Sequence, residues 1–398
     1  MTPLSNYTSV GFFSGAGGLD LGFESAGFVH RYSSDIDSEC CNTMSMNRPG
    51  WIVECADVRN LEVDGLNADV VLAGFPCQGF SLGGHRRIED SRNEYFRDAI
   101  RLVNQIRPTV VVFENVLNMR TMSFDGNVSA AETIKTALQE IGYETTYDSF
   151  RVSRYGVPQT RRRFVFVGVE GGIPDGYLLP RGTKNETSIR DFVYDLAADS
   201  IRGSLIELPN HSPKWEFKSK VHKSRFHSLA EISELTITPL RLSRTASDGN
   251  PVRSFDAPFP AIDTGTIWGW GAGKVHAERF LPDRSKRQYV RNKESTARLW
   301  KIESDILRRF TGRELARIQT FPDNWIFSGN GVSDIQKQIG NAVPVKFSSV
   351  IARSVKNLLD HKHLGIDLKG SKSSKPFSIS SRSGLSSLAT GHTSTPCL

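Results

Sequence analysis

The stretch Ser9-Val-Gly-Phe-Phe-Ser-Gly-Ala-Gly-Gly-Leu-Asp-Leu-Gly-Phe-Glu-Ser-Ala26 decides the fold. Its apolar start, residues 9–13, predicts a strand, residues 14–18 predict a glycine-rich turn, and residues 19–26 predict a helix. A strand joined to a helix in this way typically begins a parallel sheet covered by helices, and the turn offers ligands the N–H groups of the helix start. Asp20 stands where the dinucleotide fingerprint G-x-G-x-x-G has its third glycine, which argues against NAD.

The alternation of strands and helices continues to about residue 170. Apolar and β-branched runs predict further strands, and amphipathic stretches between them predict helices. The expected strands are 29–32, 69–73, 109–113 and 164–168, and the expected helices are 37–46, 94–107 and 130–141. This order predicts an α/β fold built around a mostly parallel sheet.

From about residue 170 this regularity fades. Scattered prolines, glycines, basic residues and aromatics show no clear period over residues 171–250, so we expect a separate small domain or a large insertion there. The serine-rich residues 370–398 contain too little apolar surface to fold, and we expect a disordered tail.

Helical signals return near Thr311. The run Thr311-Gly-Arg-Glu314 predicts a capping box that opens a helix, and Ser333-Asp-Ile-Gln336 predicts a second one before a turn at Gly340. A last helix is expected from residue 345 to about 359.

Composition excludes several classes of protein. No apolar run approaches the ~18 residues that a membrane-spanning helix needs, and the N-terminus lacks the features of a secretion signal, so we expect a cytoplasmic protein away from membranes. Five cysteines without a C-x2-C pair argue against a disulfide framework and against a zinc site, and we expect no metal. Fifty Lys and Arg against 43 acidic residues give a net charge of +7, which favours a polyanionic partner such as nucleic acid.

Cys77 is the candidate nucleophile. It lies in Gly74-Phe-Pro-Cys-Gln-Gly-Phe-Ser81, directly after the expected strand 69–73 and therefore at the edge where α/β sheets bind ligands. A lone cysteine is more often an inert core residue, but the basic run His85-Arg-Arg87 would favour its thiolate. Glu114 follows the next expected strand and either begins an exposed turn or lies beside Cys77 as a proton donor.

Basic and acidic side chains mark the other strand ends. In Gln159-Thr-Arg-Arg-Arg163, three adjacent arginines are usually a solvated patch, but alternation would put Arg161 and Arg163 on one side of a strand as a clamp for a carbonyl, carboxylate or phosphate. Asp35 follows the strand at 29–32, where a carboxylate can hold ribose hydroxyls. Asp57, after Val53-Glu-Cys-Ala56, is expected to meet an exocyclic amine.

A series of motifs, taken in order, resembles the DNA (cytosine-5)-methyltransferase family. The resemblance spans residues 9 to about 355 and leaves out the middle region and the tail. Its motifs are Phe13-Ser-Gly-Ala-Gly-Gly18, Pro76-Cys77-Gln78, Glu114-Asn115-Val116, Gln159-x-Arg-x-Arg163, Arg313-Glu-Leu-Ala-Arg-Ile-Gln-Thr-Phe-Pro322 and Gln338-Ile-Gly-Asn-Ala-Val343.

The resemblance implies a fold and a domain division. A Rossmann-like methyltransferase sheet that binds S-adenosylmethionine would comprise residues 1–170 and 311–365. Residues 171–310 would be the target-recognition region, a smaller second domain whose part from about residue 253 returns to the core.

The resemblance also implies a cofactor site for S-adenosylmethionine. Phe13 would stack on the adenine, Asp35 would take the ribose and Asp57 the adenine amine. Asn341, from the far end of the chain, would help to enclose the methionine part. Gly11 departs from the family pattern, which usually has an acid two residues before the matching phenylalanine. The implied cofactor-binding set is Phe13, Gly15, Gly17, Gly18, Asp35, Ile36, Asp57, Val58, Pro76, Asn341 and Ala342.

The implied reaction is methyl transfer to carbon 5 of a cytosine swung out of duplex DNA. The Cys77 thiolate would attack carbon 6, Glu114 would hold and protonate ring nitrogen 3, Arg163 would bind the carbonyl at carbon 2, and Arg161 would support the site or the loop bearing Cys77. The resemblance suggests a bacterial restriction-modification system with a cognate restriction endonuclease, and it implies no obligate protein partner.

Two other functions compete with this interpretation. A non-catalytic DNA-binding module with the same fold would have no reason to retain Cys77, Glu114 and both arginines. A cytosine-5 methyltransferase acting on tRNA would share the fold and most motifs, but the long region 171–310 favours duplex DNA.

Overall fold

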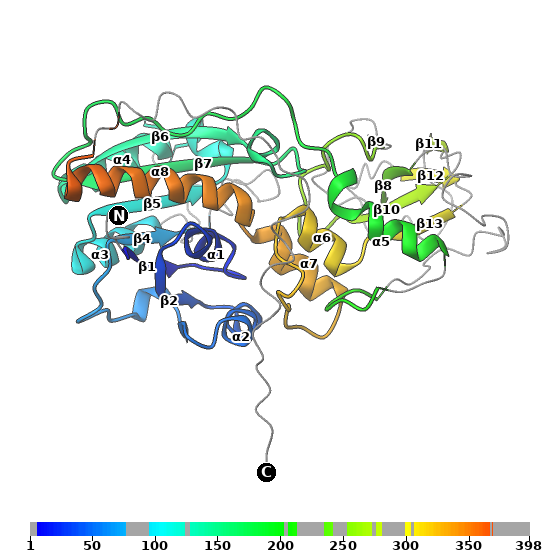
Figure 1. Ribbon diagram of the computed structural model, residues 1–398, viewed down its shortest axis with the longest axis horizontal. Helices are drawn as coiled ribbons and strands as arrows, with labels where there is room; N and C mark the ends of the chain where they lie inside the picture. Colours follow the sequence, from blue (N-terminus) through cyan, green and yellow to red (C-terminus); the bar gives the residue numbers. More distant parts are fainter. Residues whose placement is uncertain are drawn as a thin grey trace, which may run out of the picture.

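The computed structural model describes residues 6–76, 95–123, 128–202, 206–212, 235–241, 253–272, 276–280, 299–303, 306–366 and 368. Its central element is a seven-stranded sheet with the strand order β3-β2-β1-β4-β5-β7-β6 (Figure 1). The first five strands run parallel, and β7 is antiparallel to both β5 and β6. These strands are β1 (Thr8–Phe12), β2 (Val29–Asp35), β3 (Ile52–Cys55), β4 (Val70–Ala73), β5 (Val110–Asn115), β6 (Tyr143–Arg151) and β7 (Arg162–Glu170). The predicted α/β fold with a mostly parallel sheet is confirmed.

Helices cover both faces of this sheet. Because side chains alternate along β4, Val71 packs into the hydrophobic cluster under α3 and α4, while Val70 and Leu72 pack into the cluster under α1 and α8. The helices are α1 (Gly18–Ser25), α2 (Ser38–Asn47), α3 (Tyr95–Ile106), α4 (Ala130–Glu140) and α8 (Val345–Leu364).

The first and last helices of the described chain pack closely together (Figure 1). A Cβ atom at Gly22 of α1 would lie 2.3 Å from Cβ of Ser348 in α8, so the crossing requires glycine. The Ser348 hydroxyl donates a hydrogen bond of 2.6 Å to the carbonyl oxygen of Leu19. The C-terminal segment thereby returns to the helix that follows the glycine turn.

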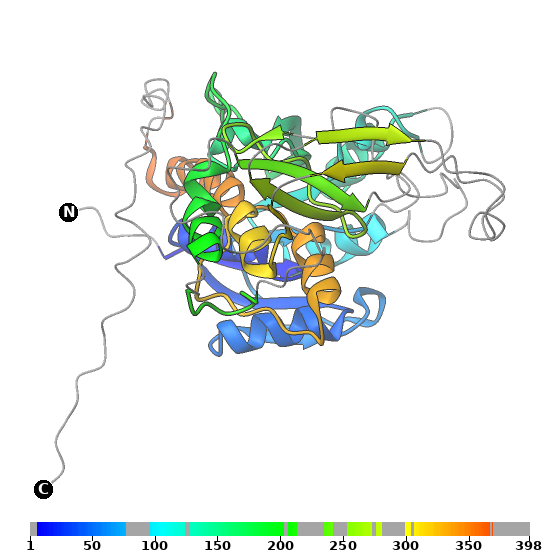
Figure 2. The same cartoon turned by 90° about the vertical axis from the view of Figure 1, so that its right-hand side faces the viewer.

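Smaller sheets form within the middle region. An antiparallel sheet has the order β13-β10-β8-β9, β11 pairs with β12, and helices lie beside them (Figure 2). Phe255 and Trp270 share one hydrophobic cluster with Leu315 of α6 and Met44 of α2, so this part of the chain packs continuously onto the larger unit. The elements are α5 (Arg190–Arg202), β8 (Leu235–Arg241), β9 (Arg253–Ser254), β10 (Ile267–Ala272), β11 (His276–Phe280), β12 (Leu299–Glu303), β13 (Ile306–Arg309), α6 (Gly312–Ile318) and α7 (Val332–Asn341).

One of the two predicted capping boxes is present. Thr311 Oγ1 accepts from the N–H of Glu314, and Glu314 Oε2 accepts from the N–H of Thr311, at 3.2 and 2.8 Å. The second prediction is wrong, because α7 begins at Val332 and its N-cap residue, Gly331, makes no side-chain cap.

The expected turn at Gly340 is also wrong, because α7 continues through this residue to Asn341. The glycine serves a close contact, since a Cβ atom there would lie 3.0 Å from the carbonyl carbon and oxygen of Asp263. The last helix runs past the expected end at residue 359 to Leu364. The tail predicted at residues 370–398 lies outside the described residues. None of the described helices is long and apolar enough to cross a bilayer.

Candidate active site

The glycine turn after β1 has an unusual backbone. Phe13, Gly15 and Gly17 have φ angles of 54°, 55° and 78°, in the left-handed region that glycine adopts without strain. Phe13 is not a glycine, and such a conformation costs of order 1 kcal/mol or more, so the turn holds its ring in place. A Cβ atom at Gly18 would lie 2.2 Å from the carbonyl oxygen of Val343, so the C-terminal segment lies directly on the turn.

Two buried glutamines fix the segment that carries Asn341 and Ala342. Gln319 Nε2 donates to the carbonyl oxygens of Ile339 and Ala342 at 2.7 and 2.8 Å, and Gln319 Oε1 accepts from Gln159 Nε2 at 2.8 Å. Asn341 is exposed at the end of α7, and Ala342 is buried. Both glutamines belong to family motifs, but their contact joins residues 160 positions apart, so no local pattern could predict it.

Asp35 ends β2 beside the glycine turn, as predicted. Its Oδ2 accepts from the N–H of Gly15 at 2.7 Å, and its Oδ1 accepts from the N–H of Asp37 at 2.9 Å. Burial raises the pKa of Asp35, and these backbone hydrogen bonds oppose the rise. Each oxygen keeps a further lone pair with which to accept a hydroxyl. Ile36, the next predicted cofactor residue, is 66% exposed at the same strand end.

Asp57 follows β3 and caps the short 3-10 helix η1 (Val58–Asn60) by accepting from the N–H of Arg59 at 3.0 Å. The Arg59 guanidinium also binds this carboxylate, with Nη2 2.5 Å from Oδ2, and this contact lowers the pKa of Asp57. An adenine amine at Asp57 would therefore share the carboxylate with Arg59. Val58 is buried directly behind it.

Glu114 and Arg163 form a buried ion pair. Arg163 Nε lies 2.5 Å from Glu114 Oε1, and the two residues come from the adjacent strands β5 and β7. Burial raises the pKa of Glu114 while the charge of Arg163 opposes the rise, and burial lowers the pKa of Arg163. Glu114 lies inside a strand, so the alternative of an exposed turn is wrong.

Arg161 has different partners from Arg163. Its Nη1 and Nη2 donate to the carbonyl oxygens of Ile262 and Gly340, both at 2.8 Å, and the side chain is buried. The predicted clamp of two guanidinium groups is therefore not formed. Strand β7 begins only at Arg162, so the alternation on which this prediction relied does not extend to Arg161. The pattern of residues 159–163 did not predict that Arg161 would join α7 to the segment around Ile262.

Cys77 lies outside the described residues, but the segment that leads to it is described up to Pro76. The N–H of Gly74 donates to the carbonyl oxygen of Phe12 at 3.3 Å, and Asn115 Nδ2 donates to the carbonyl oxygen of Phe75 at 3.1 Å. These bonds hold the segment before Cys77 against the glycine turn and against the strand that ends with Glu114. In the described part of the chain, no cluster of His, Cys, Asp or Glu is suited to a metal.

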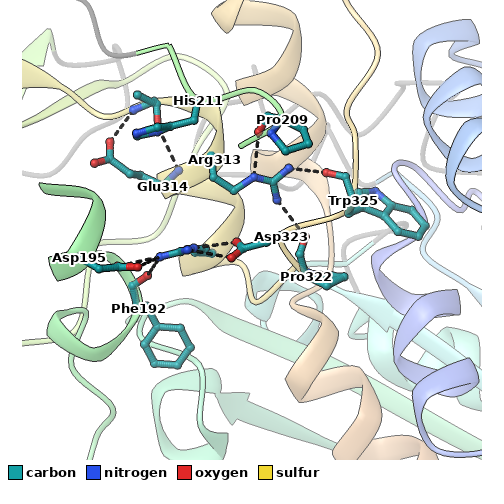
Figure 3. A network of polar contacts seen from close by, with 11 residues as sticks. Phe192, Asp195, Pro209, His211, Arg313, Glu314, Pro322, Asp323 and Trp325 are labelled. Carbon is teal, nitrogen blue, oxygen red and sulfur yellow. Dashed lines mark hydrogen bonds and ion pairs between the residues drawn. The ribbon is translucent and has the colours of Figure 1, made fainter. Parts of the chain in front are cut away.

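A buried arginine network supports the C-terminal part of the site (Figure 3). Arg313 is fully buried, and its guanidinium donates to the carbonyl oxygens of Pro209, Pro322 and Trp325 at 2.9, 2.9 and 2.5 Å. Burial lowers the pKa of Arg313 to about 10. Arg313 opens one of the quoted motifs, but the sequence did not reveal that it ties the middle region to the segment after α6.

Comparisons with known proteins point to one family. The family model described as C-5 cytosine-specific DNA methylase matches residues 7–357. The type II methyltransferase M.Eco47II of Escherichia coli is 32% identical over 368 residues, which cover 90% of this chain and 81% of the relative. M.PspPI of Psychrobacter sp. is 31% identical over 372 residues, with the same coverage of 90% and 81%. The crystal structure of the S. pombe Dnmt2 methyltransferase, at 16% identity, covers 90% of this chain and 99% of its own with a TM-score of 0.53, which shows a shared fold.

Proposed function

Because the chain belongs to the C-5 cytosine-specific DNA methylase family, we propose that it transfers a methyl group from S-adenosylmethionine to carbon 5 of a cytosine in duplex DNA through a covalent bond to Cys77. The observation that carries this proposal is the buried pair of Glu114 and Arg163 beside the segment that leads to Cys77. An acid and a guanidinium side by side match ring nitrogen 3 and the carbonyl at carbon 2, which are adjacent on cytosine.

A cysteine nucleophile solves the main chemical difficulty. Carbon 5 of cytosine is a poor nucleophile, and a thiolate bond to carbon 6 converts the ring to an enamine whose carbon 5 can accept a methyl group. The bond from Cys77 sulfur to carbon 6 forms first, and the displaced electron pair is taken up at nitrogen 3. After methyl transfer, water would take the proton from carbon 5, the electron pair of that C–H bond would expel the thiolate from carbon 6, and nitrogen 3 would return its proton. Covalent catalysis thus divides one high barrier into two lower ones.

Glu114 and Arg163 would control charge during this addition. Burial raises the pKa of Glu114, which favours the protonated acid needed to protonate nitrogen 3. Arg163 would bind the carbonyl at carbon 2 from the position it now holds beside Glu114. Arg161 would support them indirectly, through the carbonyl oxygens of Ile262 and Gly340.

The residues around the glycine turn fit the cofactor, which supplies a methyl group on a positively charged sulfur. No described atom lies within 4 Å of the point where a Cβ of Gly15 would be, so a ligand can approach the backbone there. Asp35 retains acceptor capacity for ribose hydroxyls, and Phe13 is held with its ring 6.3 Å from that of Phe75. Gly17, Gly18, Ile36, Asp57, Val58, Pro76, Asn341 and Ala342 would complete the site.

Access to the target base requires base flipping. A thiol cannot reach the face of a stacked cytosine, so the nucleotide must leave the duplex at a cost of a few kcal/mol. The net charge of +7 would assist binding to the phosphate backbone.

Residues 1–170 and 311–365 would perform the chemistry, and residues 171–310 would recognise the target sequence. By analogy with the type II relatives, the enzyme would protect host DNA from a cognate restriction endonuclease. We expect it to do so in the cytoplasm.

Methyl transfer can be tested with labelled S-adenosylmethionine and either duplex DNA or tRNA. We expect label in DNA alone, located at carbon 5 of cytosine within one short sequence context. Label in tRNA alone would overturn the DNA assignment. Absence of label in both, from protein that binds the cofactor, would overturn the proposed catalysis.

A further inference from the structure

We propose that Asp20, together with Ser14, is a cofactor-binding residue whose carboxylate holds the cationic amino-acid end of S-adenosylmethionine beneath the glycine turn. This inference rests on the proposed function, because it assumes that the cofactor lies over that turn. Asp20 departs from the dinucleotide fingerprint and is absent from the cofactor-binding set that the family resemblance implies.

Asp20 is a buried carboxylic acid that lacks a partner. It lies in the first turn of α1 and is 1% exposed, and neither of its oxygens accepts a hydrogen bond among the described residues. The Ser14 hydroxyl, at the start of the glycine turn, is also buried; it lowers the pKa of Asp20 but makes no close hydrogen bond within the described ranges. Burying polar groups without close partners costs free energy, so this pair beside the glycine turn indicates a position for a polar ligand group.

Gly11 makes room for this carboxylate. A Cβ atom at Gly11 would lie 2.0 Å from Asp20 Oδ1 and 2.7 Å from Ser14 Oγ. The carboxyl group of Asp20 therefore occupies the space that a side chain at position 11 of β1 would take. An acid that the family usually carries on the strand is here supplied by the first turn of the following helix.

No described cation neutralises Asp20. His30 Nε2 lies 3.8 Å from Asp20 Oδ1, but burial lowers the pKa of His30 to about 3, so this ring is neutral at physiological pH. The ring nitrogens of His30 bind the hydroxyls of Ser9 and Ser33 instead. The other charged group that acts on Asp20 is the carboxylate of Asp35, which repels it.

The chemistry of the cofactor suits this position. S-adenosylmethionine carries an ammonium, a sulfonium and one carboxylate, so its amino-acid end brings positive charge to the turn. Its ammonium can donate to Asp20, and its carboxylate can accept from the N–H groups at the start of α1. Burial raises the pKa of Asp20 to about 7 in the free protein, and a cation beside it would lower this pKa. Cofactor binding should then release a proton near neutral pH.

Isothermal titration calorimetry with S-adenosylmethionine tests the proposal without a turnover assay. We expect Asp20→Asn to weaken binding about tenfold or more at pH 7.5, which is the coupling expected for loss of one buried charge pair. The ratio of wild-type to Asp20→Asn affinity should rise severalfold between pH 6 and pH 7.5, as the Asp20 carboxyl ionises in the free protein. Glu24→Gln is the matched control, because Glu24 lies one turn further along α1 and binds Arg48 and Trp51 instead.

A swap of the acid provides the second test. Moving the carboxylate to the strand, in Asp20→Ala combined with Gly11→Asp, should restore much of the affinity that Asp20→Ala alone loses. Equal affinity and equal pH dependence in wild type and Asp20→Asn would overturn the inference and leave the proposed function intact. Failure of the wild-type protein to bind S-adenosylmethionine would overturn both. If Asp20→Asn does not fold, a folded swap variant that does not bind the cofactor also contradicts the proposal.

Discussion

Arg163 holds its Nε 2.5 Å from Oε1 of Glu114, and the two side chains are only 11% and 10% exposed. They meet because β5 and β7 are antiparallel neighbours, with Glu114 paired to Val165 in the ladder. Asn115, the next residue along β5, binds the carbonyl oxygen of Phe75 just before Cys77. The register of the sheet thereby sets the positions of Glu114, of Arg163 and of the segment that leads to Cys77, the proposed nucleophile.

Glu114→Gln should reduce methyl transfer while leaving cofactor binding unchanged. Glutamine keeps the shape of the side chain but cannot supply a proton to nitrogen 3, and loss of a transition-state donor costs about 3 to 4 kcal/mol, or 10²- to 10³-fold in kcat. Single-turnover methylation and calorimetric titration with cofactor measure the two effects. Glu140→Gln, at an exposed carboxylate at the end of α4, is the control. Near-normal kcat in Glu114→Gln would refute the catalytic role.

Asp20 should make the cofactor-free protein less stable as pH rises. Its pKa is raised from 3.8 to about 7 in the fold, so its contribution to stability is full below the unfolded pKa and is lost as pH rises through about 7. Between pH 5 and pH 8 the loss amounts to about 3 kcal/mol. Urea unfolding at the two pH values should show this decline in wild type and a much smaller one in Asp20→Asn. An identical decline in both proteins would show that Asp20 does not titrate in this range.

Gly22→Ala should destabilise the contact between the first and last helices. The added methyl group would lie 2.3 Å from Ser348 Cβ and 2.8 Å from the backbone nitrogen of Ser349, so α1 and α8 would have to separate. Overpacking of this kind costs about 1 to 3 kcal/mol in the free energy of unfolding. Gly50→Ala should change stability by less than about 0.5 kcal/mol, because no described atom lies within 4 Å of its Cβ position. Equal stability of the two variants would contradict the packing argument.

Arg313→Met should destabilise the protein by about 3 kcal/mol or more, because the carbonyl oxygens of Pro209, Pro322 and Trp325 would lose their donor inside the fold. Urea unfolding measures the change. Arg190→Met removes an exposed ion pair with Asp256 and should cost less than about 1 kcal/mol. Similar losses in both variants would mean that the Arg313 network adds little stability.

Much of the fold could be predicted from local patterns in the sequence. Continuous apolar runs such as 69–73 and 109–113 predicted buried strands within one or two residues, because parallel strands covered on both faces have this composition. The Thr311 capping box was correct because it depends on neighbouring residues alone. Ser333 carries a similar pattern, yet α7 begins one residue earlier, at Val332, with Gly331 as its N-cap, and Asp334 accepts from the N–H of Asn330 instead.

The sequence could place those residues of the candidate site that lie at strand ends. It could not place residues whose position depends on contacts with distant parts of the chain. Asp35, Glu114 and Arg163 follow or flank strands, and the sheet brings them to one edge. Arg161 binds a carbonyl oxygen 179 positions away, at Gly340, so no local spacing could indicate its partner. The role proposed for Asp20 could not be predicted from local sequence. It depends on the space left by the absence of a side chain at Gly11, which lies on β1 beside the Asp20 carboxylate.

The covalent role of Cys77 is tested most directly by trapping. Duplex DNA that carries 5-fluorocytosine at the target position has no proton on carbon 5 to lose after methyl transfer, so the thiolate cannot be eliminated. With S-adenosylmethionine present, the account predicts a stable protein–DNA adduct whose mass spectrum places the bond on Cys77, and no adduct with Cys77→Ser. If the wild-type enzyme methylates ordinary DNA of the same sequence yet forms no bond to Cys77 with the fluorinated duplex, the account is contradicted.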